Sequence, residues 1–180
     1  MLQIIIPANE TYDEVNNLFI NSKAQTLQLE HSLVSLSKWE SKWKRPFLTK
    51  EKKTIAESVD YIKCMTLTQN VHPDVYVNLT NANITEVSKY IDEPMTATWF
   101  GNDTNQPPSR EVVTAEIIYN WMITLNIPFE CQKWHLNRLL TLIRVTNIKN
   151  SPKKKMNKKE LMTRNTALNK ARMEKLKNKG

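Results

Sequence analysis

Glycine is nearly missing from this sequence, whose 180 residues include only two, Gly101 and Gly180. Loops that cradle phosphate groups need glycine, because only a residue without a Cβ atom lets backbone N–H groups come close to an anion. The sequence therefore argues against a P-loop and against a Rossmann dinucleotide site. We expect no cofactor.

Cysteine and long apolar runs are also scarce. The two cysteines, Cys64 and Cys131, are too few for a disulfide framework. No apolar stretch reaches the roughly 18 residues that a membrane-spanning helix needs, and no secretory signal is visible at the N-terminus. We therefore expect a protein of a reducing cytoplasm that does not insert into a membrane.

Acidic residues are rare in one part of the chain only. Residues 150–180 contain 11 Lys or Arg against two acids, whereas residues 1–149 contain 15 bases and 16 acids. The net charge of +8 therefore comes from the C-terminal segment. Because Ser151-Pro152 precedes a run of lysines, we predict an α-rich domain over residues 1–149 and a basic helical tail over residues 150–180.

Strand-like patterns are confined to the first thirty residues. Residues 2–6 are rich in β-branched side chains and end at Pro7, which cannot donate a ladder hydrogen bond. Residues 26–30 alternate between apolar and polar types, and Asn16-Asn17 suits a turn. The pattern predicts a small antiparallel sheet or hairpin at the N-terminus.

The rest of the chain has the apolar spacing of helices, and 40% of all residues are hydrophobic, enough for one core. The fold class that we predict is therefore mainly α, with the N-terminal hairpin and the basic C-terminal helix added. The predicted helices are one over residues 33–43, one capped by Thr49, two short ones between Pro73 and Pro94, one from Ser109 to about Asn126, and one from Phe129 to about Asn147. In the helix capped by Thr49, the predicted core stripe is Ile55, Val59 and Ile62.

The last two of these helices are predicted to form an antiparallel hairpin. Ser109 is the predicted N-cap of the first. The second is apolar around most of its circumference, which is typical of a helix at the centre of a core. The predicted core stripe of the first helix consists of Val113, Ile117, Trp121 and Leu125, with Ile118 and Met122 beside it.

One spacing suggests chemistry, because Cys131 and His135 lie four residues apart on a predicted helix. Structural zinc needs four ligands, and no other Cys or His has a paired spacing. A Cys–His nucleophile would also need an orienting group and oxyanion donors, which the sequence does not supply. We interpret the pair as a core cysteine and a hydrogen-bonded histidine. We expect neither a metal site nor an enzyme.

Two features suggest macromolecular binding. Trp39 and Trp43 are one helical turn apart beside Lys38 and Lys42, so they could stack nucleic-acid bases, although core anchors are the commoner role of such tryptophans. The basic tail could bind an acidic or helical protein, neutralise phosphates, or keep the chain end soluble. Its candidate contact residues are Lys153, Lys154, Lys155, Lys158, Lys159, Arg164 and Arg172.

Several phrases of the sequence resemble a family of tailed-bacteriophage proteins of about this length, the tail assembly chaperones of siphophage tail modules. The phrases are LEHSLVSLSKWESKW at 29–43, CMTLT at 64–68, PMTAT at 94–98 and IPFECQKWHLNRLLTLI at 127–143. The resemblance covers nearly the whole chain, including its basic end.

The resemblance implies a non-enzymatic helper that works in the host cytoplasm during phage assembly. Such chaperones bind the tape measure protein while the tail tube protein polymerises around it, and they are absent from the finished particle. The predicted N-terminal strands differ from a wholly helical chaperone, so a virion connector or baseplate component is the alternative. A nucleic-acid-binding protein that acts through the tail is the third. The client and the oligomeric state stay open.

Overall fold

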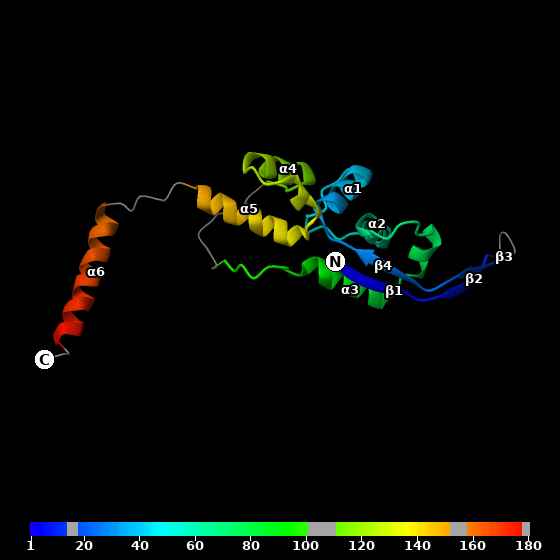
Figure 1. Ribbon diagram of the computed structural model, residues 1–180, viewed down its shortest axis with the longest axis horizontal. Coiled ribbons are helices and arrows are strands. Elements are labelled where there is room, and N and C mark those ends of the chain that lie inside the picture. The colour runs from blue at the N-terminus through cyan, green and yellow to red at the C-terminus, as the bar shows by residue number, and fades with distance from the viewer. Residues whose placement is uncertain (14–17, 101–110, 152–157, 178–180) are drawn as a thin grey trace. The chain divides into compact units, whose positions relative to one another are not determined.

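The computed structural model describes residues 1–13, 18–100, 111–151 and 158–177 (Figure 1). The protein is mainly helical, with a small N-terminal antiparallel hairpin and a basic C-terminal helix, as the sequence predicts. It divides into two compact units, Met1–Asn147 and Ile148–Gly180, and the buried core residues lie between Ile4 and Ile143. The sequence placed its domain boundary at residue 149.

The N-terminal strands form one hairpin with a single register. Strand β1 (Leu2–Ile6) pairs with β4 (Gln25–Leu29), and β2 (Asn9–Asp13) pairs with β3 (Leu18–Ser22). The residue numbers of each pair add up to the same total in both halves, so the two halves continue one another across an interruption at Pro7. The predicted turn at Asn16-Asn17 lies outside the described residues.

In the half of the hairpin formed by β1 and β4, side chains alternate between a buried face and an exposed face. Ile4 and Ile6 of β1 are buried, whereas Ile5 between them is exposed. Leu27 and Leu29 of β4 are buried on the same face. The outer edge of β4 is closed by residues 65–68, because the Leu67 N–H donates to the Gln28 carbonyl at 2.8 Å.

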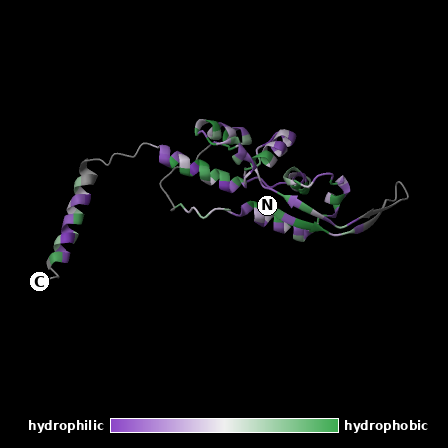
Figure 2. Ribbon diagram, viewed as in Figure 1, coloured by the Kyte–Doolittle hydropathy of each residue, from purple (hydrophilic) through white to green (hydrophobic). Residues whose placement is uncertain are grey.

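The helices follow the hairpin in chain order and build the remainder of the fold. Helix α1 packs against α2 and α4, and α3 packs against β1. Figure 2 shows the hydrophobic residues along β1 and on the helices of the first unit, whereas α6 is largely hydrophilic. The elements are α1 (Leu33–Trp43), α2 (Ile55–Met65), η1 (Pro73–Asn78), α3 (Asn81–Asp92), α4 (Ala115–Thr124), η2 (Phe129–Lys133), α5 (Leu136–Asn150) and α6 (Lys158–Lys177), where η marks a 3₁₀-helix.

The cap predicted for α2 is wrong. Thr54, not Thr49, is the N-cap, because Thr54 and Glu57 form a reciprocal capping box three residues apart. The Thr49 hydroxyl donates instead to the Pro46 carbonyl at 3.2 Å. As a result Ile55 becomes the first residue of the helix and is 80% exposed, although the sequence placed it on the core stripe.

The predictions for α4 also need correction. The helix begins at Ala115 after the N-cap Thr114, and the predicted cap Ser109 lies outside the described residues. Its buried face consists of Ala115, Ile118 and Met122, so the residues that the sequence placed beside the core stripe are the core. Helix α4 packs chiefly against α1, and the 3₁₀-helix η2 separates it from α5 along the chain.

The single helix predicted over residues 129–147 is two elements, η2 and α5. The break lies at Trp134 and His135, where the chain pairs with the start of α1. The Leu136 N–H donates to the His31 carbonyl at 2.7 Å, which replaces a bond within a continuous helix. Only one face of α5 is fully buried, at Leu136, Leu139 and Ile143, so the prediction of a helix surrounded by core is wrong.

Candidate protein-binding surface

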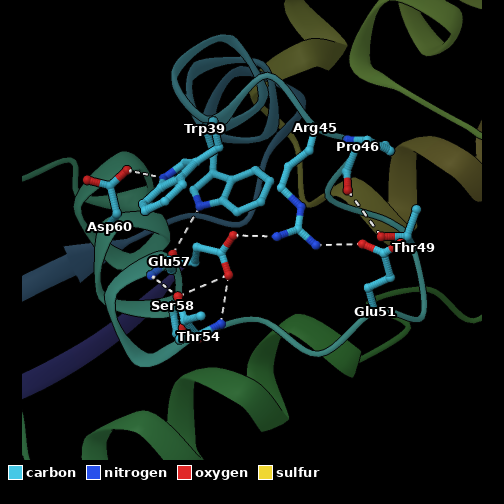
Figure 3. A network of polar contacts seen from close by, with 10 residues as sticks. Trp39, Arg45, Pro46, Thr49, Glu51, Thr54, Glu57, Ser58 and Asp60 are labelled. Atoms are coloured by element: carbon cyan, nitrogen blue, oxygen red, sulfur yellow. Dashed lines mark hydrogen bonds and ion pairs between the residues drawn. The ribbon is translucent and has the colours of Figure 1, made fainter.

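A network of polar contacts fixes α1 to α2 and to the loop between them (Figure 3). The Trp39 indole Nε1 donates to the Glu57 carbonyl at 2.9 Å. The Arg45 guanidinium donates to Glu57 Oε1 at 2.7 Å and to Glu51 Oε2 at 2.5 Å. Glu57 is buried, so its charge needs these partners, and the loop is tied to both helices.

Glu57 is held in its ionised form by the same cap that starts α2. Its Oε2 accepts from the Thr54 N–H at 2.7 Å and from the Thr54 hydroxyl at 3.0 Å. The hydrogen bond from the Thr54 backbone lowers the pKa of Glu57, burial opposes this, and the Thr54 hydroxyl and Arg45 lower the pKa further. A buried ionised carboxylate therefore anchors the first turn of α2.

Glu40 is a second buried carboxylate, and it joins three segments. Its Oε1 accepts from the Phe47 N–H and its Oε2 accepts from the Ala115 N–H, both at 2.7 Å. Ala115 is the first residue of α4, whose N-cap Thr114 makes no side-chain capping bond. Glu40 therefore caps α4 from another helix and complements its dipole.

On the outside of this framework, α2, η1 and the start of α3 surround an open groove of about 640 Å³. Two of its apolar side chains are almost fully open to solvent, Ile55 at 80% and Val77 at 82% exposure. Neither position is needed to close the core. The other apolar residues that line the groove are Trp43, Ala56, Val59, Leu79 and Ile84.

The lining of the groove also contains three charged residues, Lys42, Asp60 and Lys63. Asp60 forms a hydrogen-bonded ion pair with Lys42. It also accepts a hydrogen bond of 2.9 Å from the Trp43 indole. Burial opposes ionisation of Asp60, but the bonds from Lys42 and Trp43 outweigh it and lower its pKa. The Lys63 ammonium lies 5.3 Å from the centre of the Tyr76 ring, an arrangement that favours a cation over the ring face.

A second hollow of about 350 Å³ lies between α2, α3 and the loop after α1. Phe47, Ile62 and Val87 in its wall are buried core residues. Lys53 stands 4.2 Å from the centre of the Phe47 ring, and burial together with the nearby Arg45 lowers the pKa of this amine. The hollow is smaller than the groove and lacks its almost fully exposed apolar side chains.

The residues that suggested chemistry are engaged in the core. His135 Nε2 donates to the Tyr90 carbonyl at 3.0 Å and its Nδ1 accepts from the Asn137 N–H at 3.3 Å, so both ring nitrogens are used. Cys131 is buried in η2. Within the described residues, no group of three or more His, Cys, Asp or Glu side chains is placed to hold a metal ion. The pair is a core cysteine and a hydrogen-bonded histidine, as we interpreted it.

Of the two tryptophans that could stack bases, Trp39 and Trp43, only Trp43 reaches the surface. Trp39 is fully buried, which confirms its predicted role as a core anchor, and its ring stacks on that of Trp43 at a centroid distance of 6.0 Å. Trp43 lies at the edge of the core and lines the groove. Trp99, at 85% exposure, is the most exposed of the five, and it stands outside the groove.

The basic tail provides a second candidate surface. Lys153, Lys154 and Lys155 lie outside the described residues, and Lys158 and Lys159 begin α6. Arg164 and Arg172 are exposed along α6. The structure thus places the last four of the seven predicted contact residues on one helix, in a unit separate from the groove.

Sequence reasoning did not find the groove. It assigned Ile55 to the core and gave Val77 no role, and neither residue belongs to a recognisable motif. Among the described residues, no helix is long and apolar enough to cross a membrane. Comparison of the chain with protein-family models, with curated proteins and with solved structures finds no significant match.

Proposed function

We propose that this protein is a non-enzymatic tail assembly chaperone of a tailed bacteriophage. In this proposal it binds the tape measure protein or the tail tube protein in the host cytoplasm during tail morphogenesis. The observation that carries the proposal is the open apolar groove of α2, η1 and α3, with Ile55 and Val77 exposed at its margin. The phrases at 29–43 and 127–143 resemble the chaperone family, and this resemblance is the reason for proposing a tail protein as the client.

The groove has the properties that transient protein recognition requires. Exposed neighbouring apolar side chains release water when a partner covers them, at about 25 cal/mol per Å² of buried apolar surface. The capping box of Thr54 and the bonds of Asp60 hold the groove wall in place before a partner arrives. A preformed groove suits an amphipathic helix, which is the secondary structure that a long helical client offers.

The test is capture of the tagged protein from cells in which the phage assembles, followed by mass spectrometry. We expect wild-type protein to recover the tape measure or tube protein and to be missing from purified virions. An Ile55→Lys, Val77→Lys double variant should lose the client. Ile123→Lys, an equally drastic change at a residue of α4 that is 60% exposed outside the groove, should retain it.

Two results would contradict the proposal. Client recovery by the double variant would remove the groove from the binding site. A stoichiometric amount of the protein in virions would make it a structural component.

The structural alternative has one observation in its favour, the β2–β3 half of the hairpin. This half extends beyond the helices (Figure 1), and no further strand pairs with it in the described part of the chain. Unpaired strand edges can add to the sheet of a neighbouring protein. A virion connector or baseplate piece would use the hairpin in that way, and the virion analysis above distinguishes this role from a chaperone.

Nucleic-acid binding through α6 is the third candidate. Arg164 and Arg172 are exposed on a helix in a segment with a charge of +9, so phosphate contacts would be independent of base sequence. Such binding would weaken steeply with added salt. Recovery of nucleic acid without a tail protein would move the function to this helix.

A further inference from the structure

We infer that the groove of α2, η1 and α3 takes an amphipathic helix whose apolar stripe is flanked by Asp or Glu residues. The inference rests on the proposed function, since it specifies the chemistry of the segment that the chaperone would bind. The groove lining matches this chemistry, because it combines apolar side chains with the lysines Lys42 and Lys63.

The apolar part of the groove suits a helix of about three turns. Helix α2, which forms one wall, has 11 residues and is therefore roughly 16 Å long. Ile55 stands at its first position, and Val77 stands on the facing element η1. A partner helix with apolar residues at positions i, i+3, i+4 and i+7 would cover both side chains together with Val59, which follows Ile55 by one turn of α2.

The charged residues of the groove determine which residues should flank the apolar stripe of the partner helix. Asp60 is the one carboxylate in the lining, and it is buried with hydrogen bonds from Lys42 and Trp43, so its charge is already compensated. Lys63 is exposed above Tyr76 and makes no ion pair within the described residues. Lys42 keeps 61% of its side chain exposed despite its pairing. The open charges along the groove are therefore positive.

The same charges disfavour this chain's own basic segment as the occupant. Residues 150–180 contain 11 Lys or Arg against two acids, so they would bring like charges against Lys42 and Lys63. A carboxylate-bearing helix of another protein meets the lysines with opposite charge, which also speeds association. We therefore assign the groove to a partner and not to the tail.

The experiment compares two fluorescent synthetic helical peptides that share one leucine stripe and differ only in their flanking residues, Glu in one and Lys in the other. Binding to the full chain is measured by anisotropy. We expect the Glu peptide to bind about fivefold to thirtyfold more tightly at low salt, which corresponds to about 1–2 kcal/mol from two exposed ion pairs together. The difference should shrink as salt screens the lysines.

Reversing the charge of single lysines tests whether the preference for the Glu peptide arises in the groove. Lys63→Glu should abolish or invert the preference, whereas Lys89→Glu, at an exposed residue of α3 that does not line the groove, should leave it unchanged. Equal affinity for the two peptides, or an equal effect of both substitutions, would overturn the assignment of an acidic partner. Failure of both peptides to bind would overturn the helix-in-groove inference, while client capture from infected cells would still stand as the separate test of the proposed function.

Discussion

His31 and His135 lie ring to ring inside the protein, with centroids 5.1 Å apart. His31 Nδ1 is 2.5 Å from the Tyr61 hydroxyl of α2, and the His135 ring packs edge-on against Tyr90 of α3 at 4.9 Å. Burial, reinforced by the neighbouring His135, lowers the pKa of His31 to about 3, and burial lowers the pKa of His135 as well. Both imidazoles are therefore neutral in the folded protein near pH 7.

This arrangement predicts instability in mild acid. The ordinary histidine pKa of about 6.5 applies to the unfolded chain, so between about pH 6.5 and pH 3 the unfolded state binds more protons than the folded state. The free energy of unfolding should therefore decrease as the pH is lowered through this range, by up to about 1.4 kcal/mol per pH unit from His31 alone. Urea unfolding at several pH values measures this slope, and an unchanged slope in His31→Gln would contradict the assignment.

Glu40 gives a second prediction at the scale of one residue. Glu40→Gln removes the charge and turns an amide N–H₂ toward one of the two backbone donors, Phe47 or Ala115. We expect a loss of about 2–3 kcal/mol in the free energy of unfolding, the usual cost of a buried charge-assisted bond. Glu116→Gln, an exposed change on α4, should stay within about 0.5 kcal/mol. Equal stability of both variants in urea would show that Glu40 does not cap α4.

The burial of a single residue could be predicted from the sequence where hydrophobicity alone determines it, and not where it depends on a distant partner. Trp39 was recognisable as a core anchor because a large apolar ring is usually buried. The burial of Glu40 depends on Ala115, 75 residues along the chain, and such a pairing has no local signature. Val77 was missed because nothing in the sequence distinguishes an exposed valine from a core valine.

At the scale of elements, substitutions test which threonine caps α2, Thr54 as in the structure or Thr49 as the sequence predicts. Thr54→Ala should cost about 1 kcal/mol of stability, since it removes the hydroxyl that accepts from the Glu57 N–H. Thr49→Ala should cost less than about 0.5 kcal/mol, because its hydroxyl donates to the Pro46 carbonyl at 3.2 Å and is not the N-cap of α2. Chemical unfolding measures the free energy of unfolding of both variants. A larger loss of stability in Thr49→Ala than in Thr54→Ala would show that Thr49 is the cap.

Most elements could be predicted from their periodicity, but their ends and faces could not. The alternation in β4 and the spacing of Leu33, Leu36 and Trp39 in α1 are local patterns that survive in the structure. The break between η2 and α5 depends on pairing of residues 135–136 with residues 31–32, which is a contact across the fold. The buried face of α4 likewise depends on its packing against α1.

At the scale of the whole molecule, the core is complete without the basic tail. The buried hydrophobic residues end at Ile143, and α6 belongs to a separate unit. We predict that a chain ending at residue 150 keeps one cooperative unfolding transition, with a midpoint close to that of the full chain. Thermal unfolding followed by circular dichroism measures this. Loss of the cooperative transition would mean that residues 151–180 contribute to the core.

The central claim is that the groove of α2, η1 and α3 binds a phage tail protein, and site-specific photo-crosslinking tests it most directly. A photoreactive amino acid is placed at Val77 in the groove or at Ile123 outside it, both of them exposed, and cells assembling the phage are irradiated. We predict that Val77 crosslinks to the tape measure or tube protein and that Ile123 does not. Equal crosslinking from both positions, or no tail protein on Val77 while the tagged chain still recovers one, would contradict the claim.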